Sequence, residues 1–272
     1  MPGSPELSPE DLQGLKDWFF QYVHSFYSQN PLIQKPLKLK EDHSLRVGTE
    51  ILNIGRELAL SAQDLRIAEA MALFHDIGRF AQITRYQTFV DGKSANHAAL
   101  GVQVLEQEKV LAALTDATQA LILKAVSYHN RLNIPAGESP ECVFYSRLLR
   151  DADKVDILAL FSRYYREGPE ERSSAVELDL PDRPEVSADV LATLQQGAVV
   201  SNRQLKTLND FKLLQLAWVY DINFPPTLRI IRERHYLKNI RDTLPVSEQI
   251  DRIYARMLSF LEEKLSAEAK DT

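Results

Sequence analysis

The sequence has little of several features that define other classes of protein. Its one cysteine, Cys142, excludes an intramolecular disulfide and a zinc cluster built from several thiolates. The longest apolar runs, such as residues 213–220, are far too short to span a bilayer, and residues 1–10 lack the basic and apolar parts of a secretory signal. The net charge of −6 at pH 7 argues against general binding of DNA or RNA, which needs a basic surface. These absences predict a soluble, cytoplasmic protein that binds neither a membrane nor a nucleic-acid polymer.

Glycine is also scarce, and the rest of the composition is typical of helices. Only ten glycines occur in 272 residues, and long segments are rich in Leu, Ala, Glu, Lys and Arg, so we expect an all-α protein. Residues 1–9 contain three prolines and no periodicity, which predicts a disordered tail. No repeat or change of composition divides the rest of the chain, which predicts one domain over residues 10–272. Helices are expected from Pro9, from near Lys40, over 64–77, from His97, over 116–129 and 141–165, and in a C-terminal extension over 187–197, 203–220, 227–239 and 246–266.

The helix expected over residues 64–77 ends in an unusual pair, His75 and Asp76. The histidine lies on the apolar, core-facing side of this helix, in register with Ala72. An ionised carboxylate follows it at once, and Gly78 then ends the helix. Burying a charged carboxylate is costly unless a cation or a strong set of donors meets it. The pair therefore predicts a metal ion at this end of the helix.

Three further histidines occupy the same kind of position, at one end of an apolar helical stripe. His43 and His97 each begin such a stripe, and His129 ends one. A single histidine of this kind is more often a buried core residue, but four on successive helices together with Asp76 favour a metal site. Imidazoles and carboxylates suit Fe, Mn, Zn or Ni, with Mg as a further candidate, and a ligand set without thiolates favours a catalytic site.

The order of these residues resembles the HD-domain superfamily of metal-dependent phosphohydrolases, over roughly residues 40–160. Its signature is H…HD…D on an all-helical bundle. Residues 75–79 (HDIGR) resemble the HD-x-G-[KR] form of the signature, and residues 151–156 (DADKVD) resemble its D-x-D-[KR]-x-D form. Asp151 and Asp153 lie about 200° apart on a helix, so only one can face the metal, and periodicity does not decide between them. The resemblance implies Asp153, which directly precedes the basic residue.

His97 and His129 resemble the two extra histidines of the dinuclear subgroup, which is ordered H…HD…H…H…D. The resemblance implies one or two divalent ions, and hydrolysis of a phosphate ester or anhydride by a metal-activated hydroxide. It implies a first ion held by His43, His75 and Asp153, a second held by His97 and His129, and a bridge between them by Asp76. Asp76, Arg79 and Lys154 would be catalytic. The phosphate partners would be Arg79 and Lys154, with Lys93, Arg131 and Arg46 as further candidates, and Asp156 would orient Lys154 or a ligand histidine.

The resemblance leaves the reaction open. The dinuclear subgroup includes cyclic-dinucleotide phosphodiesterases, dinucleoside-polyphosphate hydrolases and di-iron oxygenases. Asn130 and Arg131 stand where the cyclic-dinucleotide form has a second histidine and a later GYP triplet, which argues against that activity. We expect a phosphohydrolase acting on a nucleotide or another small phosphorylated molecule. The alternatives are a di-iron oxygenase with the same ligands and a non-catalytic ligand sensor; a homodimer is compatible with the sequence.

Overall fold

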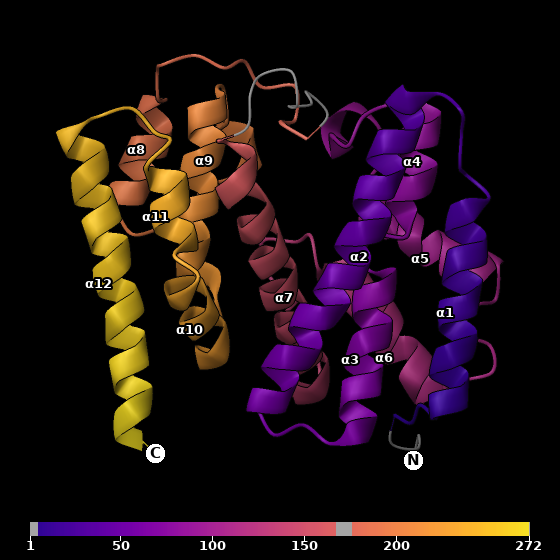
Figure 1. Cartoon of the computed structure of the whole chain (residues 1–272). Coiled ribbons are helices and arrows are strands. Elements are labelled where there is room, and N and C mark those ends of the chain that lie inside the picture. The colour runs from indigo at the N-terminus through magenta and orange to yellow at the C-terminus, as the bar shows by residue number, and fades with distance from the viewer. Residues whose placement is uncertain (1–4, 167–175, 272) are drawn as a thin grey trace. The chain divides into compact units, whose positions relative to one another are not determined.

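The computed structural model describes residues 5–166 and 176–271, and within these ranges the chain forms helices and no strand (Figure 1). The prediction of an all-α protein is therefore confirmed. The chain divides into two compact units, residues 1–156 and 157–272, and each is described by itself. The prediction of one domain over residues 10–272 stays a prediction. Every helix in the described ranges is too short or too polar to traverse a lipid bilayer.

The first unit contains all the predicted motifs. Its longest helices are α2 (Pro31–Glu57) and α7 (Pro140–Tyr164), and α7 continues past residue 156 into the second unit. The helices are α1 (Pro9–His24), α2 (Pro31–Glu57), α3 (Ala62–Phe74), α4 (Gly78–Tyr86), the short 3-10 helix η1 (Asp91–Lys93), α5 (His97–Gln107), α6 (Asp116–Tyr128) and α7 (Pro140–Tyr164).

Helix α2 begins earlier than predicted, at Pro31 rather than near Lys40. The Asn30 side chain accepts a hydrogen bond from the backbone N–H of Leu32, and proline is well suited to the first helical position. Pro36 lies inside the helix, but it removes only one helical hydrogen bond and the helix continues through it. The earlier start places Lys40 within the helix instead of at its end.

Gly78 has a different structural role from the predicted one. Helix α3 ends at Phe74, a turn follows, and Gly78 is the first residue of α4. The glycines with positive φ in the described chain are Gly137 and Gly197, so Gly78 is not a left-handed helix cap. A Cβ atom on Gly78 would lie 2.2 Å from the carbonyl oxygen of His97. The glycine is needed because α4 and α5 start in close contact.

An aromatic cluster fills the core of the first unit. Phe19, Phe74 and Phe80 are fully buried, and they come from α1, α3 and α4. The ring centroid of Phe19 lies 6.5 Å from that of Phe74 and 6.2 Å from that of Phe80, both in edge-to-face geometry. This packing fixes the end of α3, where the His-Asp pair follows.

Residues 5–8, the described part of the predicted tail, are held against the first unit. Leu7 is buried, and the backbone N–H of Glu6 donates to the Thr118 hydroxyl at 2.8 Å. The same hydroxyl donates to the Glu6 carbonyl at 2.9 Å. These residues are therefore ordered, in contrast to the expectation; residues 1–4 lie outside the described chain.

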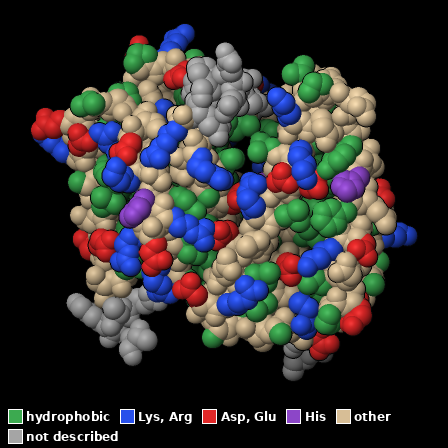
Figure 2. All heavy atoms as spheres, viewed as in Figure 1, with side chains coloured by type: hydrophobic (Ala, Val, Ile, Leu, Met, Phe, Trp, Pro, Cys, Tyr) green, Lys and Arg blue, Asp and Glu red, His purple; other side chains and the backbone are tan. Residues whose placement is uncertain are grey.

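The central helix of the second unit is α9 (Leu208–Ala217), and all of its residues are buried. The helix predicted over residues 227–239 is two helices, because His235 adopts a left-handed backbone conformation with φ of 56° between them. On the face drawn in Figure 2, Lys and Arg side chains are interspersed with Asp and Glu side chains over each unit. The elements are α8 (Ala188–Gln195), η2 (Asn202–Gln204), α9 (Leu208–Ala217), η3 (Trp218–Asp221), α10 (Pro225–Glu233), α11 (Tyr236–Arg241) and α12 (Glu248–Asp271).

Candidate metal centre

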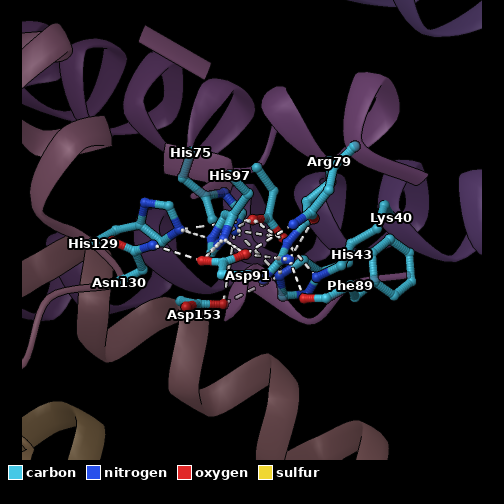
Figure 3. A network of polar contacts seen from close by, with 12 residues as sticks. Lys40, His43, His75, Arg79, Phe89, Asp91, His97, His129, Asn130 and Asp153 are labelled. Atoms are coloured by element: carbon cyan, nitrogen blue, oxygen red, sulfur yellow. Dashed lines mark hydrogen bonds and ion pairs between the residues drawn. The ribbon is translucent and has the colours of Figure 1, made fainter. Parts of the chain in front are cut away.

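The structure brings all six predicted metal ligands together inside the first unit (Figure 3). They come from α2, the turn after α3, the start of α5, the end of α6 and the middle of α7. Their ligand atoms form two groups, and within each group the atoms lie within 4.8 Å of one another. The first group is His43, His75 and Asp153, and the second is Asp76, His97 and His129.

Asp76 lies between the two groups and presents one oxygen to each. Its Oδ2 atom lies 3.5 Å from His43 Nε2 and 3.6 Å from His75 Nε2. Its Oδ1 atom lies 3.4 Å from His97 Nε2 and 3.7 Å from His129 Nε2. The carboxylate is 2% exposed. This arrangement is that of a carboxylate able to bridge two cations.

Backbone carbonyls determine which ring nitrogen carries the proton in two of the histidines. Nδ1 of His75 lies 2.7 Å from the carbonyl oxygen of Ala72, and Nδ1 of His129 lies 2.7 Å from that of Val126. A carbonyl oxygen can only accept, so both Nδ1 atoms carry the proton and donate it. The Nε2 atom of each ring therefore directs a lone pair into the cluster.

Carboxylates hold the other two histidines in the same way. His43 Nδ1 lies 2.7 Å from Asp156 Oδ2, and Asp156 is in turn held by Arg46, whose Nε lies 2.6 Å from Oδ1. His97 Nδ1 lies 2.8 Å from Asp91 Oδ2. A carboxylate on the second nitrogen is typical of metal-ligating histidines, because it fixes the ring and its tautomer.

The inward nitrogens lie too close together for neutral rings without a cation. Nε2 of His43 is 3.2 Å from Nε2 of His75, and Nε2 of His97 is 2.9 Å from Nε2 of His129. With Nδ1 protonated in each ring, both nitrogens of a pair present lone pairs, and neither can donate to the other. A metal ion, which accepts several lone pairs at once, removes the conflict. The residues present therefore fit the metal that their pattern implies.

Electrostatics keep two of the histidines neutral and Asp76 charged. Burial lowers the pKa of His75 to about 4, and burial together with the charge of Arg79 lowers the pKa of His97 to about 3. Burial raises the pKa of Asp76, but Lys40, with smaller contributions from His75, His129 and Arg79, outweighs it and holds this pKa well below its usual value. Neutral imidazole and ionised carboxylate are the forms that bind metal ions.

The structure places Asp153, and not Asp151, in the cluster. Asp151 is buried on the same helix but belongs to neither of the two groups. Asp153 Oδ1 lies 3.1 Å from His43 Nε2 and 3.7 Å from His75 Nε2. The choice that helical periodicity left open is therefore determined by the register of α7.

The predicted phosphate-binding cations differ in their burial and in their contacts. Arg79 reaches it: Nε is 3.5 Å from Asp76 Oδ1, and the side chain is largely buried. Lys154 is buried on α7, Lys93 is exposed in η1, and the exposed Arg131 stacks on a tyrosine of α6. Arg46 pairs with Asp156 instead of facing the cluster.

Sequence reasoning missed two residues of the site. Asp91 holds His97, but nothing in the sequence spacing marks an aspartate as the partner of a histidine six residues later. Lys40 lies one helical turn before His43, and its Nζ atom is 2.6 Å from Asp76 Oδ2. A lysine at i−3 from the first ligand was the available signal, because it places the ammonium group on the same face of α2 as His43.

The fold and the site together define an all-helical protein with a buried cluster of histidines and aspartates suited to divalent metal ions. Residues 41–158 match the family model described as the HD domain, so this part of the chain is an HD domain. The match contains every residue of the cluster. No curated protein and no solved structure matches the chain.

Proposed function

We propose that the protein is a phosphohydrolase with a dinuclear metal centre. In this assignment His43, His75 and Asp153 hold one ion, His97 and His129 hold the other, and Asp76 bridges them. The observation that supports it best is the position of Asp76, whose two oxygens face the two groups separately. A mononuclear site would not require His97 and His129 to direct their lone pairs at the second oxygen.

The metal ions, when bound, would supply Lewis acidity and a water molecule activated near neutral pH. The residues of the chain supply the geometry. Asp156 and Asp91 fix two of the histidines through Nδ1, and backbone carbonyls fix the other two, so the Nε2 atoms are already directed at the cluster. Such preorganisation is the main protein contribution in phosphoryl transfer, where positioning and charge stabilisation dominate.

Charge supports the proposed class of substrate. A phosphate ester or anhydride brings negative charge to a site that already holds cationic side chains and would hold metal ions. We propose a nucleotide or another small phosphorylated molecule. The interspersed surface charges in Figure 2 offer no support for a polymeric nucleic acid as the partner on that face.

The test combines metal analysis with a phosphate-release screen. Protein purified without oxygen is analysed for Fe, Mn, Zn and Ni, and is then tested against a panel of nucleotides and phosphate monoesters. His97→Ala and His129→Ala should each lower the stoichiometry from two ions to one, whereas Asp76→Ala should lower occupancy at both positions. His24→Ala is the matched control, because His24 is exposed and pairs with Glu41 outside the cluster. Unchanged stoichiometry in the two histidine variants would refute the dinuclear assignment.

A di-iron oxygenase is the second candidate, because four imidazoles and two carboxylates are also a suitable ligand set for iron. The discriminating measurement is O₂ consumption by the iron-loaded protein in the presence of each compound of the panel. Substrate-dependent O₂ uptake without phosphate release would favour the oxygenase over the hydrolase.

A further inference from the structure

Lys40 makes the shortest contact that any cationic side chain makes with Asp76. Its Nζ atom lies 2.6 Å from Asp76 Oδ2, and the side chain is 18% exposed. The same Oδ2 atom faces His43 and His75 of the first group. The ammonium group is therefore next to the oxygen that would bind the first metal ion.

The hydrogen bonds of Arg79, the other cation at Asp76, tie it to the protein. Its Nη1 atom donates to Gln82 Oε1 at 2.6 Å, to the Phe89 carbonyl at 2.7 Å and to Asp91 Oδ1 at 3.1 Å. These bonds hold the loop that carries Asp91, the partner of His97. Arg79 is thus a positioning residue for the second group of ligands.

One ring lies close to both cations. Lys40 Nζ and the guanidinium carbon of Arg79 are each 5.6 Å from the centroid of Phe89, which is buried. Cations are attracted to the face of an aromatic ring, and the ring limits where they can move. Arg79 is held in place by its hydrogen bonds, whereas the one polar contact of Lys40 in the described chain is with Asp76.

We propose that Lys40 is a substrate-binding residue that exchanges Asp76 for a phosphate oxygen when the first metal position is filled. This inference rests on the proposed function. A divalent cation held by the first group and Asp76 would repel the ammonium group that contacts Asp76 Oδ2. A phosphate bound at the metals carries negative charge to the same region, and lysine binds phosphate as a compact point charge.

The proposal predicts opposite effects of one substitution on two affinities. Lys40→Met removes the ammonium group that competes with metal for Asp76, so it should tighten Mn²⁺ binding. It also removes a charge-assisted hydrogen bond to phosphate, so the affinity of the Mn²⁺-loaded protein for inorganic phosphate should fall by roughly tenfold or more. Lys40→Arg keeps the charge and should retain most of the phosphate affinity. A residue with only a structural role would not strengthen metal binding while it weakens phosphate binding.

The experiment measures Mn²⁺ affinity by competition with a chelator, and phosphate affinity by calorimetry on the Mn²⁺-loaded protein. Lys38→Met is the matched control, since Lys38 lies on the same helix, is half exposed and pairs with Asp42 at 3.0 Å. It should change neither affinity. Phosphate affinity that is unchanged in Lys40→Met, or metal affinity that falls in it, would overturn the inference while leaving the metal centre in place. A wild-type protein that takes up no metal would overturn the proposed function, and this inference with it.

Discussion

Replacement of Gly78 by alanine is the sharpest test of how the fold builds the site. A Cβ atom at this position would lie 2.2 Å from the carbonyl oxygen of His97, 2.5 Å from the backbone nitrogen of Gly101 and 2.9 Å from Cβ of Leu100. The first two are backbone atoms of α5, so no change of side-chain rotamer relieves the contacts. The start of α5 must move away from α4, or α4 must move away from α5.

The size of the effect follows from this geometry. Insertion of a methyl group into a packed region typically costs about 1–3 kcal/mol, and contacts with backbone place Gly78→Ala at the upper end of that range. A loss of about 3 kcal/mol would lower Tm by roughly 6–12 °C for a domain of this size. The second consequence is specific, because His97 is the first residue of α5 and supplies a nitrogen to the second group. Movement of α5 should weaken the second metal position more than the first.

The assay is thermal unfolding followed by circular dichroism, together with metal stoichiometry. Gly48→Ala is the control, because Gly48 lies within α2 and a Cβ atom there would meet nothing within 4 Å. Alanine is the better helix former, so Gly48→Ala should raise stability by about 0.5–1 kcal/mol. Replacement of glycine by alanine should therefore raise the free energy of unfolding at position 48 and lower it at position 78. A Gly78→Ala variant with unchanged Tm and full metal occupancy would refute the close-approach argument.

Two further predictions concern residues that hold the cluster and its scaffold. Asp91→Asn should lower the metal affinity of the second position by roughly 10–100-fold and leave that of the first unchanged, because Asp91 fixes His97 through Nδ1. An equal loss of affinity at both positions in a chelator titration would contradict this. Tyr145→Phe should destabilise the protein by about 1 kcal/mol, since the Tyr145 hydroxyl donates to Asp64 Oδ1 at 2.9 Å in the folded chain. Burial raises the pKa of Asp64, but hydrogen bonds from Ser61 and Tyr145 outweigh it and lower this pKa. The stabilisation is therefore present above the ordinary aspartate pKa and is lost as the pH falls through the lowered pKa of the folded protein. Urea unfolding at pH 7 and pH 3 should therefore show a smaller acid-induced loss in Tyr145→Phe than in the wild type, and equal losses would show that the bond does not contribute.

The sequence predicted well which histidines come together, because each lies on the apolar face of a helix or directly after one. His43, His97 and His129 were found from the apolar stripes that they begin or end, and His75 from the stripe before it. Periodicity reports which face of a helix is buried, and a polar residue on that face needs a partner. The number and order of these histidines predict that the four faces meet at one point. The structure confirms that the four histidines lie together.

The positions that sequence reasoning missed depend on how segments approach one another. Gly78 was interpreted as a helix stop, whereas its role is contact with α5, and periodicity contains no information about the distance between two helices. The split at His235 in the second unit depends on a left-handed residue that is not glycine, which is uncommon even though histidine is among the residue types enriched in that conformation. Asp91 begins the three-residue 3-10 helix η1, which is too short to show a repeat from which the direction of its side chain could be predicted.

Lys40 and Arg79 explain how a buried carboxylate can be present in the fold before any metal binds. An ionised Asp76 without a cation would be strongly destabilising at 2% exposure. The ammonium group at 2.6 Å and the guanidinium at 3.5 Å supply positive charge on its two oxygens. The four imidazoles are meanwhile held through Nδ1 by groups outside the cluster. The folded chain therefore supplies a cation to each oxygen of the buried carboxylate and a partner to the second nitrogen of each imidazole.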